Sequence, residues 1–251
     1  MNLSVIIIAK NEASNIADCL KSVDFADERI VLDGGSTDDT VQIATSLGAK
    51  VIVVKDWHGF GPQKNLALSH ANGKWVLSLD ADERVTPALQ QEIEAAVQQP
   101  ANAVFEIPRQ TNFCGQWIHH CGWYPDHVAR LFQNGQAQFS SAQVHEQLIF
   151  SALPVHRFQH PLLHYSYPTT GHYWHKLQTY SEAWALQRFQ AGQTTTMTRA
   201  ALSAATAFLK SYVIRLGFLD GAMGFAVCFM QAQAAFGKYF SLYCLNQSKH
   251  D

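Results

Sequence analysis

Cysteine, charge and long apolar runs are all scarce in this chain of 251 residues. It has five cysteines, an odd number, and no C-x-x-C pair. A disulfide framework is therefore not expected, and the composition is typical of a protein from a reducing compartment. The apolar run in MNLSVIIIAKNE lacks a preceding basic region and is too short for a secretory signal, so it indicates a first strand.

The C-terminal part has few long charge-free stretches. The longest, Gly221 to Gly237, is shorter than the about 20 apolar residues of a membrane-spanning helix. Charged residues are only 15% of the chain and apolar residues are 47%, which indicates a folded globular protein. Residues 1–170 hold 11 basic and 17 acidic residues, a net −6, whereas residues 171–251 hold 7 and 3, a net +4. The sequence therefore predicts a basic C-terminal face.

Short apolar runs alternate with helical patterns over the first 100 residues. Strands are expected at residues 3–9, 29–32, 49–56 and 74–83, with helices after each. The segment GPQKN is expected to be a loop that leads into the third helix, and Thr86 and Pro87 to begin the fourth. This alternation predicts right-handed βαβ units and a mostly parallel sheet.

The texture changes in the second half of the chain. From Ala103 to about Tyr167 aromatic residues and histidines are frequent, and short strands such as QVHEQLIF, residues 143–150, are expected. From about Thr169 onward the pattern is helical. One long helix is expected over residues 199–218 and another over residues 221–243.

Polar side chains follow three of the predicted strands. These residues are Asn11, Glu12, Asp33, Asp80 and Asp82. Ligands of open parallel sheets bind beyond the carboxyl ends of the strands, and the GPQKN loop adds Lys64 near the same edge. Acids from several strands are therefore expected to converge there with at least one base.

The aspartates of LSLDADE, Asp80 and Asp82, project to the same side of an extended chain. Two carboxylates so close repel each other unless a cation lies between them. A hard divalent cation whose shell is completed by a diphosphate suits such a pair. A solvated turn at the end of a strand is the alternative.

Four segments occur in this order: VIIIAKNEASNI, IVLDGGSTDDT, GPQKNLALSHANGKWVLSLDADE and ARLFQNGQAQFSSAQVHEQL. Together they resemble the family 2 glycosyltransferases over residues 3–170. The resemblance implies the GT-A fold, an α/β fold with a Rossmann-like, mostly parallel sheet flanked by helices. It also implies a catalytic domain over residues 1–170, with a nucleotide-sugar half (1–100) and an acceptor half (101–170), followed by a helical extension (171–251).

The resemblance also assigns the donor site. The nucleotide sugar would be bound by Ala9, Asn11, Glu12, Asp33, Gln63, Lys64 and Asp80. Asp33 would contact the base or ribose, and Lys64 suits a diphosphate because its ammonium is a point charge with three donors. Asp80 and Asp82 would bind Mg²⁺ or Mn²⁺. His164 is a candidate further metal ligand, with a hydrogen-bonded core histidine as the alternative.

Glu146, in QVHEQL, matches the general base of similar transferases. An acceptor hydroxyl must lose its proton as it attacks, and one base without a nucleophile suits a single inverting displacement. A surface glutamate on an edge strand is the alternative, and neighbouring His145 is expected to be structural. Trp123 and Tyr124 offer an apolar platform for the acceptor sugar, or pack in the ordinary way.

The C-terminal segments SYVIRLGFLDGAMGF and GKYFSLY are similar to the tail of bacterial β-1,4-glucosyltransferases of the lipopolysaccharide inner core. This resemblance implies transfer of glucose from UDP-glucose to an inner-core heptose. The expected partners are a UDP-sugar, a lipid-linked core oligosaccharide, the membrane surface and a second copy of the chain, but no nucleic acid. The expected location is the cytoplasm, peripheral to the inner face of the inner membrane.

Three alternatives to this function are considered. Transferases of other surface glycans carry similar tails. A nucleotidyltransferase shares such a sheet, but its glycine-rich first loop is replaced here by AKNEAS. A non-catalytic sugar-binding protein is the third, against which the intact D-x-D pair and Glu146 argue.

Overall fold

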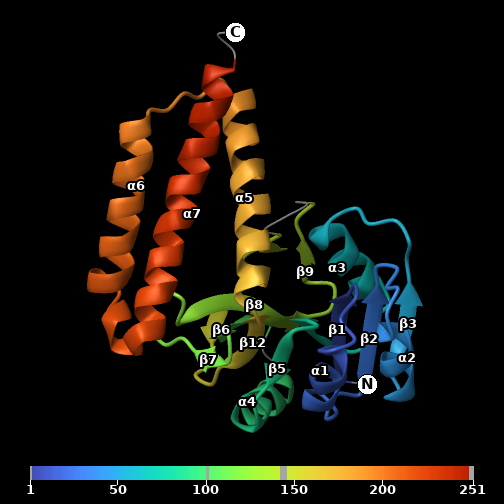
Figure 1. Ribbon diagram of the computed structural model, residues 1–251. Helices are drawn as coiled ribbons and strands as arrows, with labels where there is room; N and C mark the ends of the chain where they lie inside the picture. Colours follow the sequence, from blue (N-terminus) through green and yellow to red (C-terminus); the bar gives the residue numbers. More distant parts are fainter. Residues whose placement is uncertain (1, 100–101, 142–145, 249–251) are drawn as a thin grey trace. The chain divides into compact units, whose positions relative to one another are not determined.

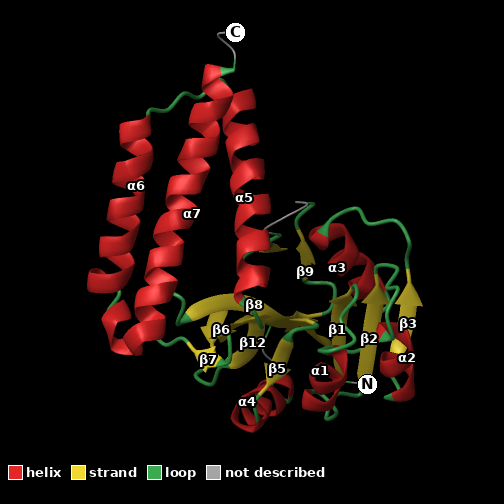
Figure 2. Cartoon of the chain, viewed as in Figure 1, coloured by secondary structure: helices red, strands yellow, loops and turns green. Residues whose placement is uncertain are grey.

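The computed structural model describes residues 2–99, 102–141 and 146–248. Figure 1 traces the chain and Figure 2 shows its helices and strands. The chain divides into two compact units: unit 1 comprises residues 1–109 and 126–164, and unit 2 comprises residues 110–125 and 165–251. The segment 110–125 thus groups with the C-terminal helices, while the expected domain boundary at residue 170 stays a prediction.

Unit 1 begins with the predicted alternation of strands and helices. Its parallel strands are β1 (Leu3–Ala9), β2 (Glu28–Asp33), β3 (Lys50–Val53) and β4 (Trp75–Asp80). The helices are α1 (Ile16–Ser22), α2 (Thr40–Ser46), α3 (Phe60–Ser69) and α4 (Pro87–Val97), the last preceded by the short strand β5 (Glu83–Val85). The predicted fold class, a mostly parallel α/β sheet with a helical C-terminal part, is confirmed.

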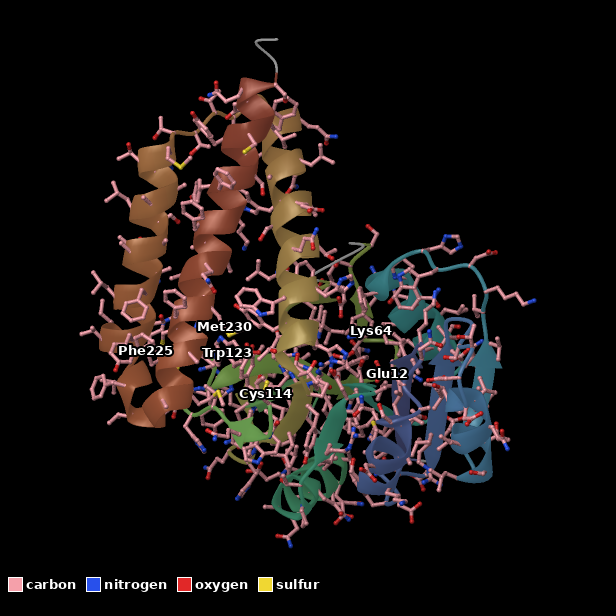
Figure 3. The ribbon with its side chains drawn as sticks, in the orientation of Figure 1. Glu12, Lys64, Cys114, Trp123, Phe225 and Met230 are labelled. Atoms are coloured by element: carbon pink, nitrogen blue, oxygen red, sulfur yellow. The ribbon has the colours of Figure 1, made fainter. Side chains whose placement is uncertain are left out.

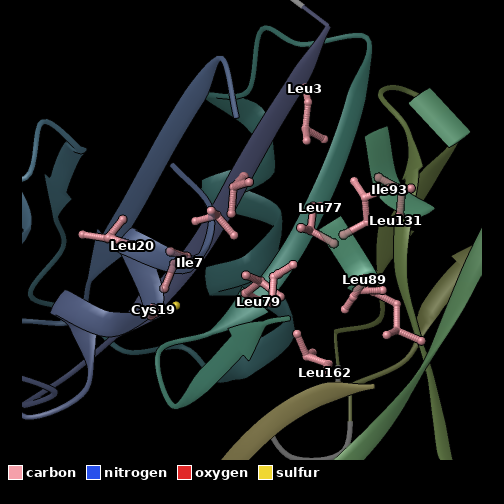
Figure 4. Packing of buried hydrophobic residues seen from close by; sticks show 14 of the residues in the cluster. Leu3, Ile7, Cys19, Leu20, Leu77, Leu79, Leu89, Ile93, Leu131 and Leu162 are labelled. Carbon is pink, nitrogen blue, oxygen red and sulfur yellow. The ribbon is translucent and has the colours of Figure 1, made fainter. Parts of the chain in front are cut away.

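The central strand β1 is buried along its whole length, because β2 and β4 pair with its two edges and other elements cover both faces. On one face Ile7 packs with Leu77 and Leu79 of β4 and with Leu20 of α1 (Figure 4). On the other face Ile6 and Ile8 pack in a second cluster that includes Ala67 of α3. This double cover fixes where β1, β2 and β4 end.

Beyond β4 the sheet continues with β6 (Val104–Phe113), β7 (Gln116–Trp117), β8 (Asp126–Gln133), β11 (Val155–Arg157) and β12 (Leu162–Tyr167). Strand β8 is antiparallel to β4 and β6, β7 is antiparallel to β6 and β12 to β5, whereas β11 is parallel to β6. The order along the sheet is β3-β2-β1-β4-β8-β6-β12-β5, with β7 and β11 paired to β6. A separate pair joins β9 (Ala137–Phe139) to β10 (Leu148–Phe150), so the described part of the predicted strand at 143–150 is β10.

Two helix starts in unit 1 show how the local sequence determines where a helix begins. At α4 the Thr86 side chain accepts a hydrogen bond from the Leu89 amide, and Pro87 occupies the first turn, as predicted. The predicted GPQKN loop is wrong, because α3 already begins at Phe60. Pro62 fits there since the first turn of a helix does not need its amide hydrogen.

Unit 2 contains three long helices, α5 (Thr170–Gln190), α6 (Met197–Leu209) and α7 (Gly221–Gln247). They lie side by side, with α7 packed against both α5 and α6 (Figure 1). The predicted single helix over residues 199–218 is wrong. After Leu209 the chain forms a π-helical turn, Lys210–Ile214, and a 3₁₀ turn, Gly217–Asp220, with Leu216 at φ +54° between them.

Within the described part of the chain, no one helix has the length and apolar character needed to cross a membrane. The segments Met197–Ile214 and Gly217–Gln247, which meet at an angle of 74°, reach that length and composition only as a bent pair.

Candidate active site

Two turns that follow β1 and β2 hold each other in place; we call residues 9–12 and 33–37 the β1–β2 rim. Asn11, at φ +57°, accepts a hydrogen bond from the Thr37 amide at 2.8 Å and donates its own amide to Ser36 Oγ at 2.8 Å. Asp33 is fully buried and accepts from the amides of Gly35 and Ser36 at 2.9 and 2.8 Å and from the Ser36 hydroxyl. Asparagine tolerates the left-handed backbone because its side chain bonds locally.

An indole ring lies over this rim. The Gly34 amide donates to the Ala9 carbonyl at 2.8 Å, and a Cβ at Gly34 would lie 2.9 Å from the Trp57 ring. Only glycine therefore allows this close approach. Trp57 packs edge-to-face against Phe60, with ring centroids 5.2 Å apart, and is itself 37% exposed. An aromatic face thus lies beside the turn that the sequence predicts to contact the nucleoside.

Gln63 and Lys64 lie in the first turns of α3, and both are buried. Gln63 Nε2 donates to the Asp56 carbonyl at 2.8 Å, which ties the helix to the loop before it. Figure 3 labels Lys64 together with Glu12 of the β1–β2 rim. Glu12 Oε2 accepts a hydrogen bond from Asn15 Nδ2 at 2.8 Å. The predicted donor-site residues of unit 1 are therefore ordered by contacts within the protein.

Lys64 joins two of the predicted site residues directly. Its Nζ lies 2.9 Å from Asp80 Oδ1 and 2.6 Å from Glu146 Oε1. It also lies over the Phe139 ring, 5.7 Å from the centroid. The predicted donor-binding aspartate and the predicted base therefore share one ammonium group, although they come from the end of β4 and the segment before β10.

The contacts continue through the interior as a row of alternating charges, which we call the charge chain. Arg130 of β8 donates to Asp80 Oδ2 at 2.6 Å and to Glu83 Oε1 at 2.5 Å. Arg109 lies 3.6 Å from Glu83 Oε1 and 2.6 Å from Asp126 Oδ2. In order, the members are Glu146, Lys64, Asp80, Arg130, Glu83, Arg109 and Asp126. The fully buried Glu83 is thus matched by cations, without which its burial would be very costly.

The charge chain keeps Asp80 and Arg130 ionised. Burial raises the pKa of the Asp80 carboxyl, but the neighbouring charges of Arg130 and Lys64 outweigh it and hold that pKa well below its usual range. Burial disfavours the charged guanidinium of Arg130, but Asp80 and Glu83 raise its pKa above the usual value. The cations that neutralise Asp80 in the structure are therefore protein side chains.

Asp82 faces a different partner, His164. The β12–β5 pairing, which sets His164 opposite Glu83, brings His164 Nε2 to 3.2 Å from Asp82 Oδ2. Two ligands of one Mg²⁺ or Mn²⁺, each about 2.1 Å away and at right angles, lie about 3 Å apart, so this oxygen and nitrogen fit such an ion. Among the described residues no three His, Cys, Asp or Glu side chains are grouped to hold a metal, so further ligands would come from outside the protein.

Sequence reasoning missed the interior of the charge chain. Arg130 pairs with Asp80 and Glu83, and Arg109 pairs with Glu83, although these residues are far apart in the sequence. No local sequence pattern therefore predicts the pairs. Arg84 was also missed: its guanidinium donates to the Ala81 carbonyl at 2.8 Å and braces the D-A-D turn. The one available signal was the presence of charged residues within otherwise apolar strands.

The remaining predicted site residues lie elsewhere. Trp123 belongs to unit 2 and packs against Phe113 and Tyr167, with centroid distances of 5.8 and 5.6 Å. Tyr124, also of unit 2, lines a cavity with His119. Their acceptor role stays a prediction. His145 lies outside the described residues, so its expected structural role stays a prediction.

Comparison with known proteins gives one family. The sequence profile described as Glycosyl transferase family 2 matches residues 4–149. An uncharacterized glycosyltransferase of Rickettsia typhi is 33% identical over 246 residues, covering 93% of this chain and 84% of the relative. The lipopolysaccharide core biosynthesis glycosyltransferase LpsC of Rhizobium meliloti is 28% identical over 158 residues, covering 59% of this chain and 57% of the relative. Among solved structures, S. aureus TarS 1–349 has a TM-score of 0.49 at 16% identity, covering 100% of this chain and 91% of that one, a likeness too distant to carry an argument.

The charge chain predicts a large stability loss on removal of its central cation. Arg130→Met should lower the free energy of unfolding by about 3–5 kcal/mol, because Glu83 and Asp80 lose a buried partner. The matched control is Arg157→Met, whose side chain is 65% exposed in its pair with Glu106 and should cost at most about 1 kcal/mol. Urea unfolding followed by circular dichroism measures both, and equal losses in the two variants would contradict the prediction.

Proposed function

Because the chain belongs to glycosyl transferase family 2, it is a glycosyltransferase, and we propose that it transfers glucose from UDP-glucose to a lipopolysaccharide inner-core heptose. The contact of Lys64 with both Asp80 and Glu146 carries the proposal, because it joins the donor-binding and base positions. The name of the relative LpsC supports a lipopolysaccharide core acceptor. UDP-glucose and the inner-core heptose rest on the resemblance of the sequence motifs, and another surface glycan is the alternative acceptor.

The nucleoside end of the donor would lie against the β1–β2 rim. The acceptor positions of Asp33 are largely used by its own turn, so its part is to shape the rim. Asn11 and Glu12 would line the pocket, and the exposed face of Trp57 would stack on the base. The diphosphate would then reach towards Lys64, whose charge suits it.

A divalent cation would be held by Asp82 and His164 of this chain together with diphosphate oxygens, and when bound it would neutralise the leaving diphosphate. Asp80 is already matched by Lys64 and Arg130, so Asp82 carries more of the metal role. An imidazole ligand favours a transition ion over Mg²⁺. Mn²⁺ is therefore the better of the two candidate ions.

Glu146 would act as the general base in a single inverting displacement. Its carboxylate takes the proton of the acceptor hydroxyl as that oxygen bonds to the anomeric carbon. The bond from the anomeric carbon to the diphosphate oxygen breaks, and its electron pair leaves with UDP, so an α-linked donor gives a β-linked product. Lys64 would couple the two halves, since a bound diphosphate competes with Glu146 for its ammonium group.

The proposed reaction is tested by transfer in solution. Purified protein incubated with UDP-glucose, Mn²⁺ and a heptose-containing core acceptor should add the mass of one hexose. Mass spectrometry of the acceptor measures this. A product linked through a pyrophosphate, or no product from any hexose donor, would contradict the proposal.

Glu146→Gln should lower kcat by about 10²–10⁴-fold, because the amide keeps the size of the side chain but cannot accept the proton. Its affinity for UDP-glucose, measured by calorimetry, should change little. The matched control is Glu94→Gln, on the exposed side of α4, which should transfer at the normal rate. A loss in Glu146→Gln smaller than about threefold would place the base elsewhere.

The metal proposal predicts that EDTA abolishes transfer and that Mn²⁺ restores it. It also predicts a binding effect: Mn²⁺ should tighten UDP binding in the normal protein and tighten it much less in Asp82→Asn and His164→Gln. His160→Gln is the matched control, because His160 also faces a carboxylate, that of Glu92, but at an exposed position. Full activity in EDTA, or an equal Mn²⁺ effect in all variants, would remove the metal from the mechanism.

A lipid-linked acceptor requires the enzyme to work at a membrane surface. Large apolar side chains are exposed at the break between α6 and α7, among them Ile214, and on α7, among them Phe225, the one of the two that Figure 3 labels. Lys210 and Arg215 lie close to them in the chain, and basic side chains attract anionic headgroups. We therefore expect the protein to sediment with bacterial membranes at low salt and to be released by high salt or carbonate. Recovery wholly in the supernatant at low salt would contradict this.

A further inference from the structure

Unit 2 contains a cavity of about 420 Å³ at the break between α6 and α7. Its walls are two facing segments, residues 119–125 and 214–216. The lining residues are His119, His120, Gly122, Tyr124, Pro125, Ile214, Arg215 and Leu216. The lining thus combines a guanidinium, two imidazoles and a phenol with exposed aliphatic side chains.

A buried carboxylate organises the donor side of the cavity. Asp220, whose side chain is 7% exposed, accepts hydrogen bonds from the amides of His119 and His120 at 3.2 and 2.8 Å. It also lies 2.8 Å from His120 Nδ1, which must donate because a carboxylate only accepts. The imidazole of His120 is therefore fixed in orientation, and Nε2 is the ring nitrogen that a bound group could reach.

The Arg215 side chain lies against the wall formed by residues 119–125. A Cβ at Gly122, which has φ +78°, would collide with the Arg215 guanidinium, so the side chain lies directly against this glycine. The Arg215 carbonyl accepts a hydrogen bond from the Cys121 amide at 3.1 Å. The backbone on both sides of this contact is unusual for residues with side chains: Cys121 has φ +60° and Leu216 has φ +54°. Such strain persists only where the surrounding structure maintains it, and it gathers at ligand sites.

The cavity also has an apolar edge. Ile214 is 75% exposed and Leu216 is 45% exposed, although both line the cavity. Phe218 and Leu219, in the next turn, are exposed as well. Exposed aliphatic and aromatic side chains gathered in one place mark a surface that contacts another apolar phase.

We propose that this cavity binds the phosphate ester of a membrane amphiphile, with the phosphate against Arg215 and His120 and the acyl region against Ile214 and Leu216. The Arg215 guanidinium suits the charged oxygens of a phosphate, and His120 Nε2, the acceptor nitrogen of the ring, suits the protonated oxygen of a phosphate monoester. Asp220, which would repel it, already faces four donors of the protein, the amides of His119 and His120, His120 Nδ1 and Cys121 Sγ. A metal is excluded as the occupant by the donor set, because His120 Nδ1 and Cys121 Sγ are both directed at Asp220, and no metal-holding group exists among the described residues.

The apolar edge is what selects a lipid over free phosphate. Inorganic phosphate would use the donors and leave Ile214 and Leu216 in water, whereas an amphiphile buries both. The site goes beyond the proposed transfer reaction, since binding needs neither the donor sugar nor the charge chain of unit 1. Its failure and the failure of the proposed function are therefore distinguishable.

The test is sedimentation with vesicles in the absence of UDP-glucose, using the full chain at physiological salt. One set of phosphatidylcholine vesicles carries phosphatidic acid and the other carries oleate at a matched surface potential. The normal protein should bind the phosphate vesicles about tenfold more tightly, since each charge-assisted hydrogen bond adds more than about 1.4 kcal/mol. Arg215→Gln and His120→Gln should each lose most of this preference.

The matched control is Lys210→Gln, which removes the same charge at the start of the π-helical turn that precedes Arg215, outside the cavity, and so weakens the general attraction to both vesicle types alike. Lys210→Gln should keep the preference for phosphatidic acid. Its circular dichroism melting curve should match those of Arg215→Gln and His120→Gln, which shows that all three variants fold. Ile214→Ser should weaken binding to both vesicle types. Equal loss in Lys210→Gln and Arg215→Gln, or no preference between the two lipids, would overturn the site. Inorganic phosphate that competes as strongly as phosphatidic acid would overturn the lipid part of the proposal.

Discussion

The site of unit 1 depends on the neutralisation of one carboxylate, that of Asp80. It stands where the apolar strand β4 ends, and it is held ionised by Lys64 and Arg130 at 2.9 and 2.6 Å. These cations come from α3 and from β8, so the position of Asp80 is fixed from two directions. The antiparallel pairing of β8 with β4, which sets Leu77 opposite Leu131, delivers Arg130 to this place. An electrostatic requirement at the end of one strand thus links a helix, two strands and the segment that bears Glu146.

The sheet supplies the other half of the arrangement. Because β1 is covered on both faces and pairs with β2, its carboxyl end is fixed beside that of β2, and the two turns beyond them bond to each other through Asn11. The site therefore has a polar rim that suits a nucleoside and a charged interior that suits a diphosphate and a proton acceptor. Asp82 and His164 lie outside the charge chain and contact each other at 3.2 Å.

What the sequence predicts correctly is mostly local. The strands of the first half, the Thr86 cap and the approach of Lys64 to the strand ends follow from apolar runs, one capping residue and the rule for open parallel sheets. The glycine and proline of GPQKN predict a loop, yet both residues are tolerated in the first turn of a helix, where α3 has them. Arg130 and Glu83 could not be found, since their pairing depends on the register of β8, which no short pattern encodes. The break after Leu209 was hidden because Tyr212, Val213 and Ile214 continue the apolar pattern of the helix before it.

The charge chain is linear, and this makes its members unequal. An interior member such as Glu83 has two partners of opposite sign, whereas Glu146 and Asp126, at the two ends, each have one. A base gains a proton and loses its charge in every catalytic cycle. Were an interior member to do so, two cations would each lose a counter-charge at once. At the end of the row, the proposed base Glu146 can become neutral while Lys64 keeps Asp80 as a partner, so no cation of the row loses its last counter-charge during turnover.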